Sequence, residues 1–365
     1  MSTVRYIPPD FSSDALRRAP AARTVPAERD GVLPEGFFAT TNLPSYVKGE
    51  DGQWTMPREP RMDGVLVRDA NGTWWVREGR RVKRGDPIVV GRAEDGSEGV
   101  LVHANGFQAD GGAQGDFHFM SSQVSREKPI DYRLIARMLV EEKRRGGYVL
   151  WVTGPALVHS RARDNLVWFI RNGYVQALLA GNAVAVHDIE AAVVGTTLGM
   201  SSEGLPTENG HAAHMRAINA VRRAGSIAQA VRDGTITGGI MHACVVEEVP
   251  FVLAGSLRDD GPLPDVITDM IAAQDATREH TVRATMAVMI ATALHSIAVG
   301  NMLPAYYDDP QRGIVELPTI CVDASEFLVS KLKDRGTHQA VGVVTNAQDF
   351  MSILRAAVER EVQEG

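Results

Sequence analysis

The chain has few lysines, no glycine-rich dinucleotide fingerprint, few cysteines and no long hydrophobic run, and each absence excludes a class of protein. Only six of the 365 residues are lysine, and none lies between Lys143 and Lys331. With a formal net charge of -7 at pH 7 and a pI near 5.8, the chain lacks the clustered Lys and Arg of a nucleic-acid or anionic-membrane surface. The scarcity of lysine also argues against an enzyme-bound imine on a lysine side chain.

The hydrophobic and cysteine content indicates the compartment. No apolar run approaches the roughly 20 residues that a membrane-spanning helix needs, and the N-terminal segment carries acidic residues where a signal peptide is apolar. We therefore expect a cytoplasmic protein. Cys244 and Cys321 lie in or beside apolar runs, which predicts buried thiols rather than a disulfide. Neither has a zinc-binding partner pattern, so no metal is predicted.

Composition changes along the chain divide it into three parts. Residues 1–30 are rich in Pro, Arg and Ala and are expected to form an extended arm. Short apolar runs separated by Gly, Asp and Asn predict a small, mainly β domain over residues 31–128, with a loop at 104–115 and a last strand and turn at 117–122. From residue 129 to 365, apolar strand-like runs alternate with amphipathic helical patterns.

This alternation predicts an α/β domain built on a parallel sheet with helices on both faces. The expected strands are 148–153, 177–179, 240–243, 251–254, 285–290, 319–322 and 342–345. The expected helices, after a first one starting near Tyr132, are 162–172, 188–194, 211–223, 226–233, 263–273, 293–299, 326–334 and 348–362.

The most informative stretch is Phe251–Asp265, a buried strand followed by a loop with Arg258, Asp259, Asp260 and Asp265. In an open parallel sheet, ligands bind at the carboxyl ends of the strands, so this charged loop is a candidate site. The alternative is a solvated turn that caps the next helix.

Polar residues follow other expected strands as well. Gly154 and Pro155, in the stretch Thr153–His159, form a turn that opens a helix and lets backbone N–H groups approach a phosphate. Asn182 follows the next strand as either a ligand contact or a helix cap. Thr292 and His295, Asp323, and Thr345 follow three later strands, where a core histidine and helix caps are the alternatives. Together they predict a nucleotide lying across the sheet edge, although the spaced glycine triplet is absent.

Histidines near acidic residues offer weaker candidates. His187 precedes Asp188, but adjacent residues rarely face each other. His211 and His214 lie three apart at a helix start, which suits a substrate or structural role better than a metal. The polar loop at 199–210 before them suits a flexible lid or a plain surface excursion.

Seven motifs stand out, at 33–42, 119–122, 170–174, 179–190, 214–219 with 223–227, 252–269 and 294–301. Together they resemble one known family, the archaeal-type ornithine cyclodeaminases. The same module is known as the conserved domain of the lysine-oxoglutarate reductase/saccharopine dehydrogenase (LOR/SDH) bifunctional enzyme and as the C-terminal part of cyanobacterial arginine dihydrolase/ornithine cyclodeaminases. Segment 306–317 and the loop at 201–209 depart from the family pattern and are expected to affect substrate specificity.

The resemblance implies conversion of L-ornithine to L-proline and ammonia with NAD as the cofactor, and a Rossmann-like fold of the deoxyhypusine synthase type. It places the NAD contacts, by position in the matching motifs, on Asn182, Ala183, Asp260, Thr292, Ala293, Leu294, His295, Asp323, Val344 and Thr345.

For the chemistry itself, we expect His159 or His211 to transfer protons, Asp259 or Glu35 to bind the amine, and Arg258 to bind the carboxylate. Two alternatives remain open: an NAD-dependent reaction on another diamino acid or an opine-like imine, and a non-catalytic nucleotide-binding module. A homo-oligomer is expected from the family's fold and a Met-rich apolar stretch.

Overall fold

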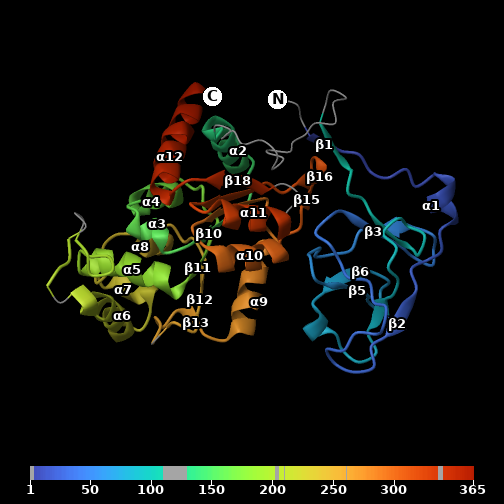
Figure 1. Ribbon diagram of the computed structural model, residues 1–365, viewed down its shortest axis with the longest axis horizontal. Helices are drawn as coiled ribbons and strands as arrows, with labels where there is room; N and C mark the ends of the chain where they lie inside the picture. Colours follow the sequence, from blue (N-terminus) through green and yellow to red (C-terminus); the bar gives the residue numbers. More distant parts are fainter. Residues whose placement is uncertain (1–3, 110–129, 202–204, 209, 260, 336–339) are drawn as a thin grey trace. The chain divides into compact units, whose positions relative to one another are not determined.

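The protein, seen in a computed structural model, folds into two compact units (Figure 1). The structure describes residues 4–109, 130–201, 205–208, 210–259, 261–335 and 340–365. Unit 1 comprises residues 1–123, 300–317 and 335–339, and unit 2 comprises the remainder. The strand and turn predicted at 117–122 lie outside the described residues.

Unit 1 is built from short antiparallel strands. Its described sheets have the strand orders β1-β9, β15-β16, β2-β7-β5-β6 and β4-β3-β8. The elements are β1 (Val4–Tyr6), α1 (Asp14–Arg18), β2 (Thr24–Pro26), β3 (Ser45–Lys48), β4 (Trp54–Thr55), β5 (Val65–Arg68), β6 (Trp74–Arg77), η1 (Gly79–Arg81), β7 (Pro87–Val89), β8 (Val100–Val102), β9 (Phe107–Ala109), β15 (Tyr306–Asp309) and β16 (Gly313–Glu316).

Alternating side chains of β5 give unit 1 two small hydrophobic clusters. Val65 and Val67 pack with Ile88 in one cluster, while Leu66 packs with Trp74 in the other. A strand with period-two side chains that are buried on both faces belongs in the middle of a domain. The mainly β composition that the sequence predicts for this part of the chain is confirmed.

The first thirty residues and the segment at 306–317 both join unit 1 through backbone pairing. β1 pairs with β9, and β2 pairs with β7. β15 and β16 form a hairpin with each other, and at its base the Ala305 amide donates to the carbonyl oxygen of Asn42 at 2.9 Å. The buried ammonium of Lys48 donates to the carbonyl oxygens of Leu16, Arg17 and Ala19 at 2.8–3.0 Å, which caps the C-terminal end of α1.

Unit 2 contains the predicted parallel sheet. Its described strands are β10 (Val149–Thr153), β11 (Ala177–Gly181), β12 (Phe251–Ala254), β13 (Val266–Ile267), β14 (Met286–Ile290), β17 (Thr319–Asp323) and β18 (Ala340–Val344). They lie in the order β13-β12-β11-β10-β14-β17-β18, and every pairing between them is parallel. The chain builds outward from β10 to β13 and then returns to place β14 on the other side of β10. The topological switch point therefore lies between β10 and β14.

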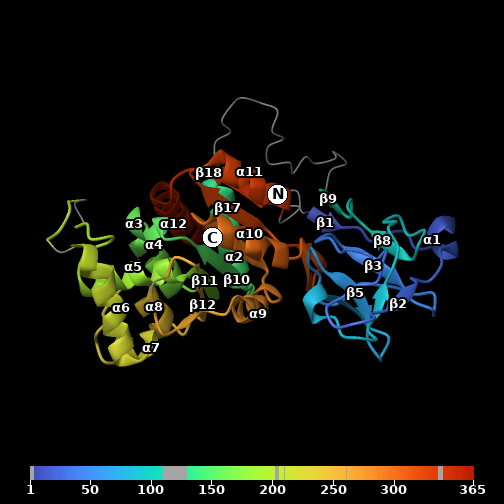
Figure 2. The ribbon, with the colours of Figure 1, turned by 60° about the horizontal axis from the view of Figure 1, so that its bottom comes forward.

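Helices cover both faces of this sheet, as Figures 1 and 2 show. They are α2 (Tyr132–Arg144), α3 (Ala156–His159), α4 (Arg163–Arg171), α5 (Asn182–Val193), η2 (Gly210–Ala212), α6 (Ala213–Ala224), α7 (Ile227–Arg232), α8 (Ile240–Val246), α9 (Met270–Thr281), α10 (Ala293–Met302), α11 (Glu326–Arg335) and α12 (Ala347–Glu364). Trp151, Leu178 and Val288 join one large core with side chains of α2 to α5, α8 and α12. Because crossovers between parallel strands are right-handed, the reversal at β10 places α10 and α11 on the opposite face.

Part of the loop predicted at 104–115 is instead strand β9, which pairs with β1. Two predicted elements of unit 2 were also wrong, and tertiary contacts explain both. Residues 240–243 are not a strand but the start of helix α8, because the carboxylate of Asp188 accepts from the Ile240 and Met241 amides at 2.9 and 2.8 Å and so caps this helix. Residues 263–273 are not one helix. Strand β13 comes first, and α9 begins only after Asp269, whose side chain accepts from the Ala272 amide.

The predicted buried thiols are confirmed: Cys244 and Cys321 are free and buried. Burial raises the pKa of the Cys321 thiol to about 12, so it is unreactive at neutral pH. Among the described residues, no helix is long and apolar enough to cross a membrane.

Candidate functional site

The carboxyl ends of the parallel strands meet at one edge of the unit 2 sheet, called here the rim. Asn182 follows β11, Asp259 follows β12, Thr292 follows β14, and Asp323 and Thr345 end or follow β17 and β18. The fold therefore brings these residues, which are up to 163 positions apart in the sequence, to the same edge of the sheet.

Asn182 connects the rim to the charged loop after β12. Its side-chain amide donates to Asp259 Oδ1 at 3.0 Å, and its carbonyl oxygen accepts from the Leu263 amide at 3.2 Å. Asp259 Oδ2 in turn accepts from the Ser256 amide at 2.7 Å. Asn182 is only 7% exposed, so its two bonds are largely shielded from bulk water, whereas the bond between Ser256 and Asp259 is exposed. Together they hold residues 256–259 and Leu263 against the first turn of α5.

At the switch point, the backbone at Gly154 lies very close to the backbone at Ala291. A Cβ atom added to Gly154 would lie 1.8 Å from the carbonyl oxygen of Ala291, so only glycine fits there. Ala291 itself has a left-handed φ of 56°, which is uncommon for a residue with a side chain. This turn starts α10 directly at the junction between β10 and β14. The hydroxyl oxygens of Thr153 and Ser296 are buried near the turn and have no hydrogen-bond partner in the structure.

His295 packs against the end of β11. A Cβ atom at Gly181 would meet its Cε1 atom at 2.8 Å, so the imidazole lies directly on the glycine backbone. Burial lowers the pKa of His295, and the ring is therefore neutral at pH 7. A neutral imidazole both accepts and donates a proton.

The other end of the rim carries one acid among exposed apolar side chains. Asp323 Oδ1 accepts from the Ser325 amide at 2.9 Å. Leu294 is 74% exposed and Val344 49% exposed, although both are large and apolar. Val344 lies opposite Asp323 in the pairing of β17 and β18, and Leu294 lies in the first turn of α10 after the neighbouring strand β14. Exposed apolar side chains at the same sheet edge as a partly buried carboxylate suit a ligand with a flat apolar group and hydroxyls.

His187 and Asp188, which as adjacent residues are not favoured as an interacting pair, bind two different partners. Asp188 is fully buried and accepts from Arg163 Nε at 2.6 Å as well as from the α8 amides. His187 Nδ1 instead lies 3.0 Å from Glu190 Oε2 and packs edge to face on His159, with ring centroids 4.6 Å apart. Sequence reasoning missed Glu190, although its place one helical turn after His187 was a usable signal.

Glu190 is the anchor of the loop from Gly195 to Ser201. It is fully buried and also accepts from Thr196 Oγ1 at 2.8 Å, the Leu198 amide at 3.2 Å and the Gly199 amide at 2.9 Å. Burial raises the pKa of this carboxyl group, but the hydrogen bonds outweigh burial and hold its pKa below the ordinary 4.5.

Because the pKa of Glu190 is lowered on folding, its stabilising contribution is fully present above about pH 4.5 and is lost as the pH falls through the folded value. Glu190→Gln is expected to unfold at a lower urea concentration at pH 7, with the difference from the native chain shrinking as the pH is lowered below about 4.5. Urea titrations across this range measure it, with the exposed Glu247→Gln as control. A difference that stays constant with pH would contradict the assignment.

The remaining predicted residues lie in several places. Arg258 is exposed in the rim loop beside Asp259, and His211 is exposed in η2. His159 ends α3 and lines a cavity together with the 195–201 loop. Glu35 is exposed in unit 1, and Asp260 lies outside the described residues. Among the side chains that the structure describes, no cluster of His, Cys, Asp or Glu is arranged to hold a metal ion.

Comparison with known families matches nearly the whole chain. Residues 133–354 match the family described as "Arginine dihydrolase ArgZ-like, C-terminal, Rossmann fold", and residues 44–134 match the C-terminal first region of the same proteins. The ornithine cyclodeaminase of Methanopyrus kandleri is 43% identical over 93% of this chain and 78% of its own length. The bifunctional arginine dihydrolase/ornithine cyclodeaminase AgrE of Nostoc sp. is 38% identical over 93% of this chain, which corresponds to 47% of AgrE.

Solved structures agree with the sequence relatives. A conserved LOR/SDH protein from Methanococcus maripaludis superposes with a TM-score of 0.84 at 39% identity, covering 94% of this chain and 99% of that one. The ternary complex of AgrE with ornithine and NAD+ superposes with a TM-score of 0.61 at 36% identity, covering 97% of this chain and 48% of that one. The predicted Rossmann-like fold with a smaller β region is confirmed.

Proposed function

The chain belongs to the family of the archaeal ornithine cyclodeaminases and the ArgZ-like C-terminal domains, and from this we propose that it is an NAD-dependent ornithine cyclodeaminase forming L-proline and ammonia. The observation that supports it most is the polar rim of the unit 2 sheet, where Asn182, His295 and Asp323 gather at the strand ends.

The rim has the features that a dinucleotide requires. The α10 N-terminus starts at the switch point and presents backbone N–H groups, which favour a pyrophosphate, and the Gly154 to Ala291 approach keeps side chains out of its way. Ser296 Oγ and Thr153 Oγ1 are buried polar atoms near this turn that lack a protein partner. The residues present therefore fit NAD without a glycine triplet.

We assign the contacts along the rim from one end to the other. Asp323 would accept from ribose hydroxyls, since the Ser325 amide donates to only one of its two carboxylate oxygens, Oδ1. The exposed side chains of Leu294 and Val344 would cover the adenine. Asn182 and His295 lie at the end of the rim formed by β11 and β14. The other proposed NAD contacts are Ala183, Asp260, Thr292, Ala293 and Thr345.

Bound NAD would accept the hydride from the α-carbon of ornithine and return it to the cyclic imine, so that ammonia and proline form without net reduction. Asp259 would place the terminal ammonium and Arg258 the carboxylate, both from the rim loop that Asn182 fixes. We assign proton transfer to His295, in place of His159 and His211, because its imidazole packs on the end of β11 at the rim. Burial lowers its pKa, so the ring can accept a proton at pH 7. A role for Glu35 stays a prediction.

The proposal is tested by incubating the protein with catalytic NAD and, separately, ornithine, lysine and arginine, while measuring ammonia, proline and NADH absorbance. We expect ammonia and proline in equal amounts from ornithine, with no net change in absorbance. Steady NADH turnover would instead indicate the opine-like reaction, and NAD binding without any product would favour the non-catalytic module. Either result would overturn the proposed reaction.

A further inference from the structure

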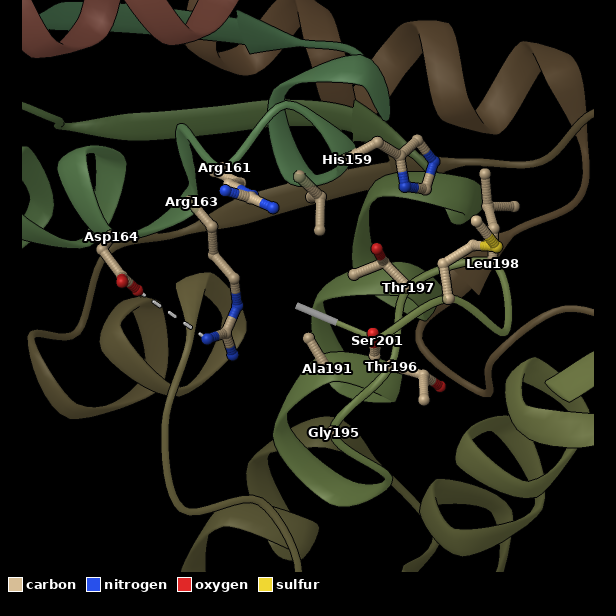
Figure 3. A pocket seen from close by; sticks show the side chains of 12 residues that line it. His159, Arg161, Arg163, Asp164, Ala191, Gly195, Thr196, Thr197, Leu198 and Ser201 are labelled. Carbon is tan, nitrogen blue, oxygen red and sulfur yellow. Dashed lines mark ion pairs between the residues drawn. The ribbon is translucent and has the colours of Figure 1, made fainter. Parts of the chain in front are cut away.

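Unit 2 contains a cavity of about 630 Å³ that none of the proposed NAD contacts line. It lies between the ends of α3 and α5, the start of α4, and the 195–201 loop (Figure 3). This volume is within the range of small-molecule sites. Because α5 has twelve residues, the cavity at its C-terminal end is roughly 15 Å from the rim at its N-terminal end.

One wall of the cavity is cationic. Arg161 lines it from the connection between α3 and α4, and Arg163 lines it from the first residue of α4. Figure 3 shows the guanidinium of Arg163 on the side of Asp164, with which it forms an ion pair. Arg161 has a left-handed φ of 64°, a conformation that costs free energy for a residue with a side chain and that often occurs at functional sites. Arg163 donates through Nε to the fully buried carboxylate of Asp188 at 2.6 Å, which fixes the position of its guanidinium and balances its charge. The further positive charge of this wall comes from Arg161.

The opposite wall is polar and uncharged. Thr197 and Ser201 contribute hydroxyl groups, and His159 contributes an imidazole whose Nδ1 atom is buried without a hydrogen-bond partner in the structure. The negative charge of Glu190 lies behind this wall and is satisfied by its four donors. Asp164 is the acidic lining residue, and its side chain is 89% exposed and 3.9 Å from Arg163 Nη1.

We propose that this cavity is a second binding site, for the oxyanion group, phosphate or carboxylate, of a small metabolite. The guanidinium groups pair with the oxyanion, Thr197 donates to it, and Leu198 and Met200 contact the organic part. Its binding requires neither NAD nor ornithine, so the proposal stands apart from the proposed reaction.

The fold also links this cavity to the rim. α3 begins just after Gly154 at the switch point and ends at His159 in the cavity, while α5 begins with Asn182 at the rim and ends beside the 195–201 loop. A bound oxyanion that shifts either helix end changes NAD affinity, and NAD changes oxyanion affinity by the same factor.

The test is isothermal titration calorimetry of the NAD-free full chain with inorganic phosphate and with succinate. Ionic strength is fixed near 0.1 M with sodium chloride, so that general screening is constant. Binding of phosphate alone indicates a phosphate ester as the natural ligand, binding of succinate alone indicates a carboxylate, and binding of both supports the oxyanion chemistry they share. Absence of heat with both anions overturns the proposal.

Variants of the lining residues test whether the anion binds in this cavity. Arg161→Gln is expected to weaken it at least about tenfold, and Thr197→Val, which keeps the side-chain shape, by roughly threefold to tenfold. The matched control is Arg171→Gln, which removes the same charge from an exposed position at the end of α4. Thermal unfolding without anion confirms that each variant is folded. Equal affinity in Arg161→Gln and Arg171→Gln would place the anion elsewhere and overturn the assignment.

Discussion

Asn182→Asp is expected to weaken NAD binding by about 100-fold, because it places a second carboxylate against Asp259 where an amide now donates at 3.0 Å. Two like charges about 4 Å apart repel by about 4 kcal/mol at an effective dielectric constant near 20. Rotation of the new side chain would relieve the repulsion but would also break the bond from the Leu263 amide. In either case the loop loses its attachment to the first turn of α5. Calorimetric titration with NAD measures the effect.

The double variant Asn182→Asp, Asp259→Asn provides the control. It exchanges the two groups, so that the amide at position 259 donates to the carboxylate at 182, which still accepts from the Leu263 amide, while the carbonyl at 259 accepts from the Ser256 amide. NAD affinity is expected to recover to within about tenfold of the native chain. The KM for ornithine is expected to be higher than that of the native chain, since position 259 no longer carries the negative charge proposed to bind the terminal ammonium. A single variant with native NAD affinity would contradict this account of the rim.

Gly154→Ala is expected to destabilise unit 2 by about 3 kcal/mol or more and to abolish NAD binding. The new methyl group would lie 1.8 Å from the Ala291 carbonyl oxygen and 3.0 Å from Thr292 Cβ, and both belong to the turn that starts α10. Neither backbone can yield without separating β10 from β14, which are paired along their whole length. For a domain of this size, a melting temperature about 10 °C lower is expected in calorimetry.

Gly238→Ala is the matched control for this substitution. The added methyl group meets no heavy atom within 4 Å, and the φ angle of Gly238 is not in the left-handed region. Its melting temperature is expected to stay within about 3 °C of the native value, and NAD binding is expected to be unchanged. Similar melting temperatures for the two glycine variants would show that the close approach at the switch point does not exist.

The architecture of unit 2 was largely determined by local sequence pattern. Apolar runs such as Val149–Thr153 and Met286–Ile290 are buried on both faces, and such runs separated by helical periodicity specify parallel strands joined by crossovers. The polar residues that follow these runs had to meet at one edge, because parallel strands all end on the same side. The rim, with Asn182, Asp323 and Thr345, was therefore predictable before the structure.

Only the tertiary structure decided which side chains pair across long sequence separations. Asp188 caps α8 from 52 positions away, which is why an apolar run at 240–243 is a helix and not a strand. Asn182 uses both sides of its amide on residues 77 and 81 positions away. Glu190 and His187 organise a cavity wall with residues from two other segments. Periodicity reports which face of an element is buried, but a hydrogen bond between distant groups depends on where the folded backbone brings them, and no local pattern encodes that.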